Sequence, residues 1–224
     1  MALIYGVESR KAANTRLTNG YLLYDWVMRK SCYPSFWGRN ITGKDQLTLS
    51  EIDFLRVKKC RIACIFDDFT EAEISANNGV KQANAAAEAA RVLHIPPNHG
   101  IAIFANIPSE WSVNHNWMLS YAYHLFHQGY IAGFMGNTDS SKNFNFDRQA
   151  SHYIQAAKDV ECFQAVFWAK EPKYNFDPEV WAPYAPSALL AKDMHLWQYG
   201  NIDFHSIRAT KSYMRDASIM ERLY

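Results

Sequence analysis

The sequence predicts an α/β fold, a single (β/α)8 barrel of the TIM type that occupies residues 1–224 as one domain. Short apolar runs alternate along the chain with longer segments of helical spacing, which is the pattern of parallel βαβ units. Seven or eight such runs within 224 residues fit the size of a compact barrel. The pattern also allows the last βα units to be irregular.

A doubly wound open sheet is the rival fold. Such a sheet usually carries a glycine-rich phosphate loop after its first strand. Here the first strand is followed by Glu8-Ser9-Arg10-Lys11, and neither GxGxxG nor GxxxxGK[ST] occurs in the chain. The barrel is therefore the better prediction.

Three strands and three helices are expected in the first part of the chain. The third helix begins at Thr70, because Thr70 and Glu73 have the spacing of a capping box. The run Ile95-Pro96-Pro97 stops it. The expected strands are residues 3–8, 33–38 and 61–69, and the expected helices are residues 15–30, 47–59 and 70–93.

Five strands and three helices are expected in the second part. Pro108 breaks the fourth strand, and Gly129 stands at the C-terminal end of the helix that follows. Residues 171–188 hold four of the eight prolines and are predicted to form a long loop. The expected strands are residues 101–107, 130–136, 162–169, 194–200 and 202–204, and the expected helices are residues 111–128, 146–159 and 206–222.

The charge balance and the length of the apolar runs each exclude one class of function. With 23 basic and 22 acidic residues and no basic run, the chain lacks the electrostatic footprint of a nucleic-acid-binding protein. No stretch of 18 apolar residues predicts a membrane span. Residues 1–8 are too short and too polar for a signal peptide, so the chain as it stands is predicted to be cytoplasmic, and extracellular if a leader was removed. The oligomeric state stays open.

Aromatic residues make up 15% of the chain and include seven tryptophans. One interpretation is a large apolar core. The other is a pocket whose ring faces stack on sugars or bases.

A (β/α)8 barrel places its site at the C-terminal ends of the strands. The residues expected there are acidic, aromatic or amide-bearing, which suits a glycan or another small polar, polyhydroxylated ligand. The candidate catalytic residues are Glu8, Asp67, Asp68 and Asp203, and the candidate ligand-binding residues are Trp37, Arg39, Asn106, Glu110, Asn137, Trp168, Gln198 and Tyr199.

Glycoside hydrolysis requires two carboxyl groups, one with a raised pKa as the acid and one ionised. The four candidate acids could supply them. Each could instead cap the helix that follows it or pair with Arg39 or Lys170, and Asp68 lies beside the predicted cap at Thr70.

Metal and cofactor signals are weak. His124 and His127 have HxxH spacing but no acid near them, which is more typical of solvated or packed histidines than of metal ligands. No serine lies in a GxSxG elbow. We expect neither a metal nor a cofactor.

A series of short motifs runs in order over nearly the whole chain and resembles the glycoside-hydrolase-like family of unknown function DUF1906, the Rv2525c-like group. That family is related to the lysozyme-type muramidases of glycoside hydrolase family 25. The motifs are Gly6-Val7-Glu8, Phe36-Trp37-Gly38-Arg39-Asn40, Leu93-His94-Ile95-Pro96, residues 102–107, residues 129–136, Phe167-Trp168-Ala169, Trp197-Gln198-Tyr199 and Ile202-Asp203.

The resemblance implies a barrel that acts on or binds peptidoglycan or another glycan, but two positions depart from the family pattern. Glu8 stands where the family usually has Asp, and the longer side chain moves the carboxylate. The fourth strand should end in an acid, yet Asn106 and Ile107 occupy the two positions that could align with it. Glu110 could replace this acid only if the turn after Pro108 folds over the barrel mouth.

Three functions therefore remain open. The first is a glycosidase with strand-end carboxylates as acid and base. The second is a catalytically silent barrel that binds a glycan or a protein partner, which the missing strand-four acid favours. The third is an enzyme for an unrelated small substrate, since a fold alone does not fix the chemistry.

Overall fold

The eight strands of the protein close into one barrel, in chain order from β1 to β8. The computed structural model describes residues 3–30, 33–139, 145–174, 177–183, 191–204 and 207–224. The strands are β1 Ile4–Ser9, β2 Phe36–Asn40, β3 Arg61–Phe66, β4 Ala102–Asn106, β5 Ile131–Gly136, β6 Ala165–Tyr174, β7 Leu196–Phe204 and β8 Ile207–Met214.

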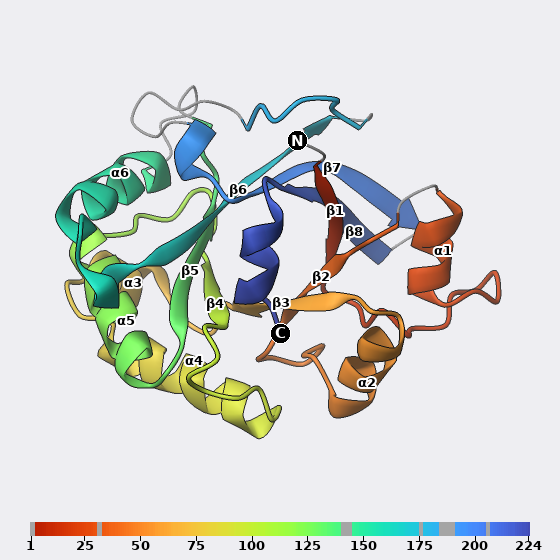
Figure 1. The fold of residues 1–224 in the computed structure, drawn as a ribbon, viewed down its shortest axis with the longest axis horizontal. Coiled ribbons are helices and arrows are strands. Elements are labelled where there is room, and N and C mark those ends of the chain that lie inside the picture. The colour runs from red at the N-terminus through yellow and green to blue at the C-terminus, as the bar shows by residue number, and fades with distance from the viewer. Residues whose placement is uncertain (1–2, 31–32, 140–144, 175–176, 184–190, 205–206) are drawn as a thin grey trace.

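Helices surround the strands from β1 to β6, as the ribbon in Figure 1 shows. They are α1 Leu23–Arg29, α2 Leu49–Val57, α3 Glu71–Ser75, α4 Val80–Val92, α5 His115–His127 and α6 Phe146–Ala157. Three 3-10 segments follow, η2 Glu161–Phe163, η3 Ala191–Asp193 and η4 Ala217–Arg222. Beyond β6 the described residues form no α-helix, so the α/β barrel with irregular last units is confirmed.

The last strand closes the barrel in an unusual direction. Strands β1 to β7 run parallel to their neighbours, whereas β8 pairs antiparallel with both β7 and β1. The prediction of a helix over residues 206–222 is therefore wrong, because most of this segment is strand β8. The residues of β8 form backbone hydrogen bonds with both β1 and β7, and this tertiary pairing outweighs the local helical spacing.

Several other boundaries differ from the expected ones; the helix expected over residues 15–30, for example, is limited to Leu23–Arg29. The capping box at Thr70 is confirmed, with the Thr70 N–H donating to Glu73 Oε2 at 2.8 Å. The helix after it is interrupted, however, and resumes as α4 beyond Gly79. A Cβ on Gly79 would lie 2.6 Å from the Tyr121 backbone nitrogen, so glycine permits the close approach of α5. Strand β6 also extends to Tyr174, into the predicted loop 171–188.

The barrel interior is filled by side chains at its N-terminal end. Phe36, Phe104 and Trp168 pack edge to face there, with ring centroids 6.1 and 5.4 Å apart. The C-terminal η4 closes this end, since Ile219 and Leu223 join the same apolar cluster and Tyr224 pairs with the Ile62 backbone. In Figure 1, η4 is the blue coil in the middle of the ring.

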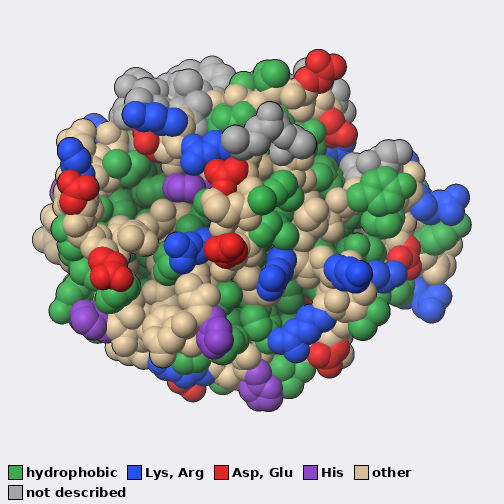
Figure 2. All heavy atoms as spheres, viewed as in Figure 1, with side chains coloured by type: hydrophobic (Ala, Val, Ile, Leu, Met, Phe, Trp, Pro, Cys, Tyr) green, Lys and Arg blue, Asp and Glu red, His purple; other side chains and the backbone are tan. Residues whose placement is uncertain are grey.

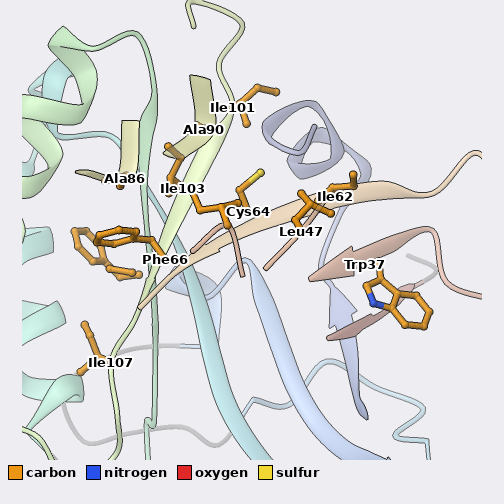
Figure 3. Packing of buried hydrophobic residues seen from close by; sticks show 14 of the residues in the cluster. Trp37, Leu47, Ile62, Cys64, Phe66, Ala86, Ala90, Ile101, Ile103 and Ile107 are labelled. Atoms are coloured by element: carbon orange, nitrogen blue, oxygen red, sulfur yellow. The ribbon is translucent and has the colours of Figure 1, made fainter. Parts of the chain in front are cut away.

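A second apolar layer lies between the strands and the helices. Figure 3 shows Cys64, Phe66 and Ile103 projecting from β3 and β4 toward Ala86 and Ala90 of α4. The alanines let α4 lie close to the sheet, which explains the Ala-rich sequence of this helix.

The surface carries mixed charge. On the face seen in Figure 2, acidic and basic side chains alternate with apolar ones and no large patch has a single sign. Among the described residues, no helix is both long and apolar enough to cross a membrane.

A buried ion pair fixes the loops after β1 and β2. Arg39 Nε donates to Glu51 Oε1 at 2.8 Å, and both side chains are at most 1% exposed. The guanidinium also donates to the backbone oxygens of Ser9, Arg10 and Asp45 at 2.9, 2.6 and 2.8 Å. Glu51 in turn accepts the Ala13 N–H at 2.7 Å. Together these hydrogen bonds hold the loops after β1 and β2 against α2.

Glu51→Gln is expected to lower the free energy of unfolding by about 3–5 kcal/mol, because Arg39 would stay buried without its counter-charge. Urea denaturation followed by circular dichroism measures this loss. Asp53→Asn on the same helix is the control, since Asp53 is 77% exposed and 3.8 Å from Arg56, and it should change stability by less than about 0.5 kcal/mol. Equal losses in the two variants would contradict the role of the buried pair.

Candidate functional site

Polar side chains replace the apolar ones at the C-terminal end of the barrel, which we call the mouth. The pairing registers place Glu8 of β1 beside Gly38 on one side and Thr210 on the other. A Cβ on Gly38 would lie 3.1 Å from Glu8 Cβ and 3.0 Å from Trp168 Cη2. Glycine at this position thus leaves room for both the Glu8 side chain and the buried indole of Trp168, and we call this indole the floor of the mouth.

Glu8 is the carboxyl group of the mouth whose environment is most altered. Its Oε2 accepts hydrogen bonds from Thr210 Oγ1 at 2.9 Å and from Gln198 Nε2 at 3.2 Å. Burial raises the pKa of Glu8, although the Thr210 hydrogen bond and the nearby charge of Lys170 act to lower it. The neutral carboxylic acid is therefore favoured more than in an exposed glutamate.

Lys170, at the mouth end of β6, has the opposite shift. Its ammonium nitrogen donates to Asn106 Oδ1 at 3.1 Å, so the strand-four position that lacks an acid serves as a neutral acceptor. Burial lowers the pKa of Lys170, while the charge of Glu8 raises it and that of Arg10 lowers it further. Glu8 and Lys170 are thus both biased toward their neutral forms.

Asp67 provides a second carboxylate at the mouth. Its Oδ2 lies 3.5 Å from Arg10 Nη2, and the side chain is 26% exposed. Asp67 and Arg10 line a cavity of about 210 Å³ together with Asn40 and the loop after β2. An open pair of this kind adds little stability, so the charges stay available to a ligand.

The remaining predicted acids lie farther out. Glu110 is exposed in the turn closed by the Trp111 N–H to the Pro108 oxygen, and its charge acts on Lys170. Asp68 is exposed and acts on Lys81 instead. The backbone of Asp203 pairs with Arg208 near the end of the β7–β8 hairpin, and its side chain lies outside the described residues.

All three predicted amides lie at the mouth or near it, and Gln198 donates to Glu8 there. Asn106 contacts Lys170, as described above. Asn137 donates from Nδ2 to Ser109 Oγ at 3.3 Å and accepts the Asp139 N–H at 2.8 Å, so it ties the loop after β5 to the loop after β4.

Three predicted ligand-binding residues face away from the mouth. Trp37 is fully buried and packs against Tyr24 of α1 at 5.7 Å between ring centroids. Arg39 is committed to Glu51 and the loops. Tyr199 stacks on Tyr213 at 4.5 Å. They lie on the outer face because side chains alternate along a strand, and Phe36, Gly38 and Gln198 occupy the inner positions.

The sequence did not single out three residues that the structure brings into the mouth. Thr210 lay in the segment expected to be helical, so its strand position was hidden. Lys170 follows the predicted strand 162–169 directly, but a lysine at a strand end is also expected as a partner that neutralises an acid. Arg10 follows the first strand directly, and its position after a strand end was the available signal.

No group of three or more His, Cys, Asp or Glu side chains in the described part of the chain is placed to hold a metal ion. Among these same residues, the buried groups around the floor that have no hydrogen-bond partner include Trp168 Nε1, Gln198 Oε1 and Ser212 Oγ. The mouth thus combines one carboxyl group biased toward its acid form, one amine with a lowered pKa, one carboxylate, one guanidinium and uncommitted polar atoms. Such a set can bind hydroxyl groups and anions and can transfer a proton.

No family model and no curated protein sequence matches the chain. Among solved structures, an uncharacterized protein of B. stearothermophilus is similar, with a TM-score of 0.76 and 25% identity over 99% of this chain and 100% of that one. The Tat-secreted protein Rv2525c of Mycobacterium tuberculosis, in complex with L-tartrate, is similar with a TM-score of 0.57 and 13% identity over 97% and 98% of the two chains.

A second structure of Rv2525c, in complex with HEPES, has a TM-score of 0.55 and 13% identity over 95% of each chain. These likenesses extend over nearly the whole length and show the fold. The resemblance to the Rv2525c-like group implied a barrel, and the structural similarity to Rv2525c agrees with it at the level of the fold.

Glu8→Gln is expected to stabilise the protein at neutral pH by about 0.5–2 kcal/mol, because it removes a carboxylate that is costly to ionise in the folded state. The folded-state pKa of Glu8 is raised above 4.5, so the wild type loses stability as the pH rises from 4.5 through that pKa. The difference between variant and wild type should therefore shrink below pH 4.5.

Urea unfolding across this pH range measures the effect. Glu110→Gln is the matched control, because Glu110 is an exposed carboxylate near the same mouth. A Glu8→Gln variant that is less stable than the wild type at neutral pH would contradict the expectation.

Proposed function

We propose that the barrel mouth binds a small polyhydroxylated ligand that carries a negative charge, and that the natural ligand is the end of a glycan such as peptidoglycan. The observation that carries this proposal is the gathering of charged groups at the mouth, where Glu8, Arg10 and Asp67 all act electrostatically on Lys170 and Asp67 pairs with Arg10. Carboxylates and amides hydrogen-bond sugar hydroxyls, while Lys170 and Arg10 attract an acidic substituent.

The solved relatives support the choice of ligand. Rv2525c was crystallised in complex with L-tartrate and with HEPES, and both molecules are small and polar and carry an acidic group. Tartrate combines hydroxyl and carboxylate groups on neighbouring carbons. An acidic sugar presents the same combination, and the muramic acid of peptidoglycan is one example.

The predicted aromatic contribution is reduced to one residue. Trp37 and Tyr199 lie on the outer face, and Trp168 is buried as the floor. A sugar ring would therefore be held mainly by polar contacts at the rim rather than between two aromatic faces. This arrangement favours a short ligand or a chain end over a long glycan lying across the barrel.

Titration of the protein with L-tartrate and with a soluble muropeptide, followed by calorimetry, tests the proposal. Lys170→Met is expected to weaken tartrate binding at least tenfold, since it removes a hydrogen bond to a charged group worth about 1.5–3 kcal/mol. Lys158→Met, which removes an exposed lysine at the end of α6, is the control and should leave the affinity unchanged. If neither L-tartrate nor the muropeptide binds to the wild type, the proposed site is refuted. Equal affinity of the wild type, Lys170→Met and Lys158→Met would refute it as well.

A second candidate function is glycoside hydrolysis, and the raised pKa of Glu8 favours it. Glu8 would protonate the leaving oxygen, and Asp67 would act as base or nucleophile. The end of strand four offers Asn106, which cannot transfer a proton in this way. Any hydrolysis would therefore have to use the carboxyl pair on β1 and after β3.

Release of reducing ends from purified peptidoglycan measures this activity. Glu8→Gln is expected to reduce the rate by about 10²–10⁴-fold, which is the usual contribution of a general acid. Glu110→Gln is the matched control. Intact glycan after long incubation, with muropeptide binding retained, would leave the barrel as a binding protein.

A further inference from the structure

Lys170 differs from the other lysines that the structure describes in contact with a partner side chain. Lys11, Lys58, Lys81 and Lys211 each lie within hydrogen-bond distance of an aspartate or glutamate, at 2.6–3.2 Å. Lys170 Nζ instead bonds the neutral Asn106 at 3.1 Å, and no carboxylate of the described residues lies within 4.0 Å of it. The barrel thus holds a half-buried amine without a direct counter-ion.

This environment makes the amine more nucleophilic than an exposed lysine. Burial lowers the pKa of Lys170, so a larger fraction carries a free electron pair at neutral pH. Lys81 is the opposite case, because its hydrogen bond to Glu73 and the charge of Glu73 raise its pKa. The two lysines therefore allow a direct comparison within one protein.

An acid of the same barrel end acts electrostatically on this amine. Glu8 of β1 and Lys170 of β6 each change the other's pKa. Both hydrogen bonds that Glu8 makes go to Oε2, from Thr210 and Gln198, so Oε1 has no partner in the described part of the chain. The raised pKa of Glu8 favours the protonated acid, and a free carboxyl oxygen can deliver that proton.

We propose that Lys170 forms a reversible imine with a small hydroxylated aldehyde or ketone bound at the mouth. The inference rests on the proposed function, in that the same mouth must admit a polar ligand. The open-chain form of a sugar's reducing end belongs to this class, as do short hydroxy-aldehydes and hydroxy-ketones.

The step balances with groups present at the mouth. The electron pair of Lys170 Nζ attacks the carbonyl carbon, and a proton moves from nitrogen to oxygen to give a carbinolamine. Glu8 then donates its proton to the hydroxyl group, the carbon–oxygen bond breaks, and water leaves. The products are a protonated imine, one water molecule and the Glu8 carboxylate, whose charge stabilises the iminium ion across the mouth.

Asn106 is a positioning residue in this scheme. Its amide holds Lys170 toward the mouth without neutralising a cation. An aspartate of the same shape would place a carboxylate at hydrogen-bond distance from Nζ and stabilise the ammonium ion, which cannot attack a carbonyl.

Reductive trapping tests the proposal. The full chain is incubated at neutral pH with glycolaldehyde and cyanoborohydride, which converts an imine into a stable secondary amine, and peptide mass spectrometry gives the rate at each lysine. We expect Lys170 to be modified at least tenfold faster than Lys81 and Lys158. The pH dependence of its rate should have a lower midpoint than that of Lys81.

Variants separate this chemistry from simple exposure. Asn106→Asp is expected to slow Lys170 modification at least tenfold while the rate at Lys81 stays unchanged, and a thermal unfolding curve checks its fold. Glu8→Gln should also slow Lys170, and it is the second variant if Asn106→Asp does not fold. Modification of Lys170 no faster than that of Lys158, or an unchanged rate in a folded variant, would overturn the inference.

The tartrate titration distinguishes this inference from the proposed function, because tartrate has no aldehyde or ketone. Tartrate binding without selective labelling of Lys170 would overturn the imine and leave the ligand site. Selective labelling without tartrate binding would support the imine and refute the anionic ligand.

Discussion

The buried pair between Arg39 and Glu51 is the constraint on which the mouth depends. The guanidinium holds the backbone after β1 at Ser9 and Arg10, and the carboxylate holds it at Ala13. Arg10 thereby stays beside Asp67, and the end of β1, which carries Glu8, cannot move relative to β2. Because a buried charge without its partner is strongly destabilising, the pair also fixes α2 in its place against the barrel.

The barrel divides its interior into an apolar lower part and a polar mouth, with Trp168 at the boundary. Aromatic rings fill the lower part and η4 closes it, so this part of the barrel is a packed core rather than a channel. Glu8 and Lys170 lie above this packing and keep only part of their solvent exposure, which raises the pKa of Glu8 and lowers that of Lys170. Partial burial of two ionisable groups costs stability.

The missing acid on strand four acquires a specific meaning from this arrangement. Asn106 does not leave a gap in the site, because it accepts a hydrogen bond from Lys170. An acid at that position would create an ion pair and a different chemistry. The asparagine at the end of strand four and the lysine without a counter-ion are therefore linked by one hydrogen bond, between Asn106 and Lys170, which are 64 positions apart in the chain.

The sequence by itself determined the barrel, most strand positions, the capping box at Thr70 and the strand-end location of Glu8, Asp67 and Asn106, because periodicity and capping are local properties. Only the tertiary structure decided which side of a strand faces the mouth, since a shift of one residue reverses every side chain. That is why Arg39 proved structural and why Thr210, on a strand stabilised by β1 and β7, was not recognised. The lowered pKa of Lys170 was also decided by the tertiary structure, because it depends on burial and on neighbours that only the closed barrel brings together.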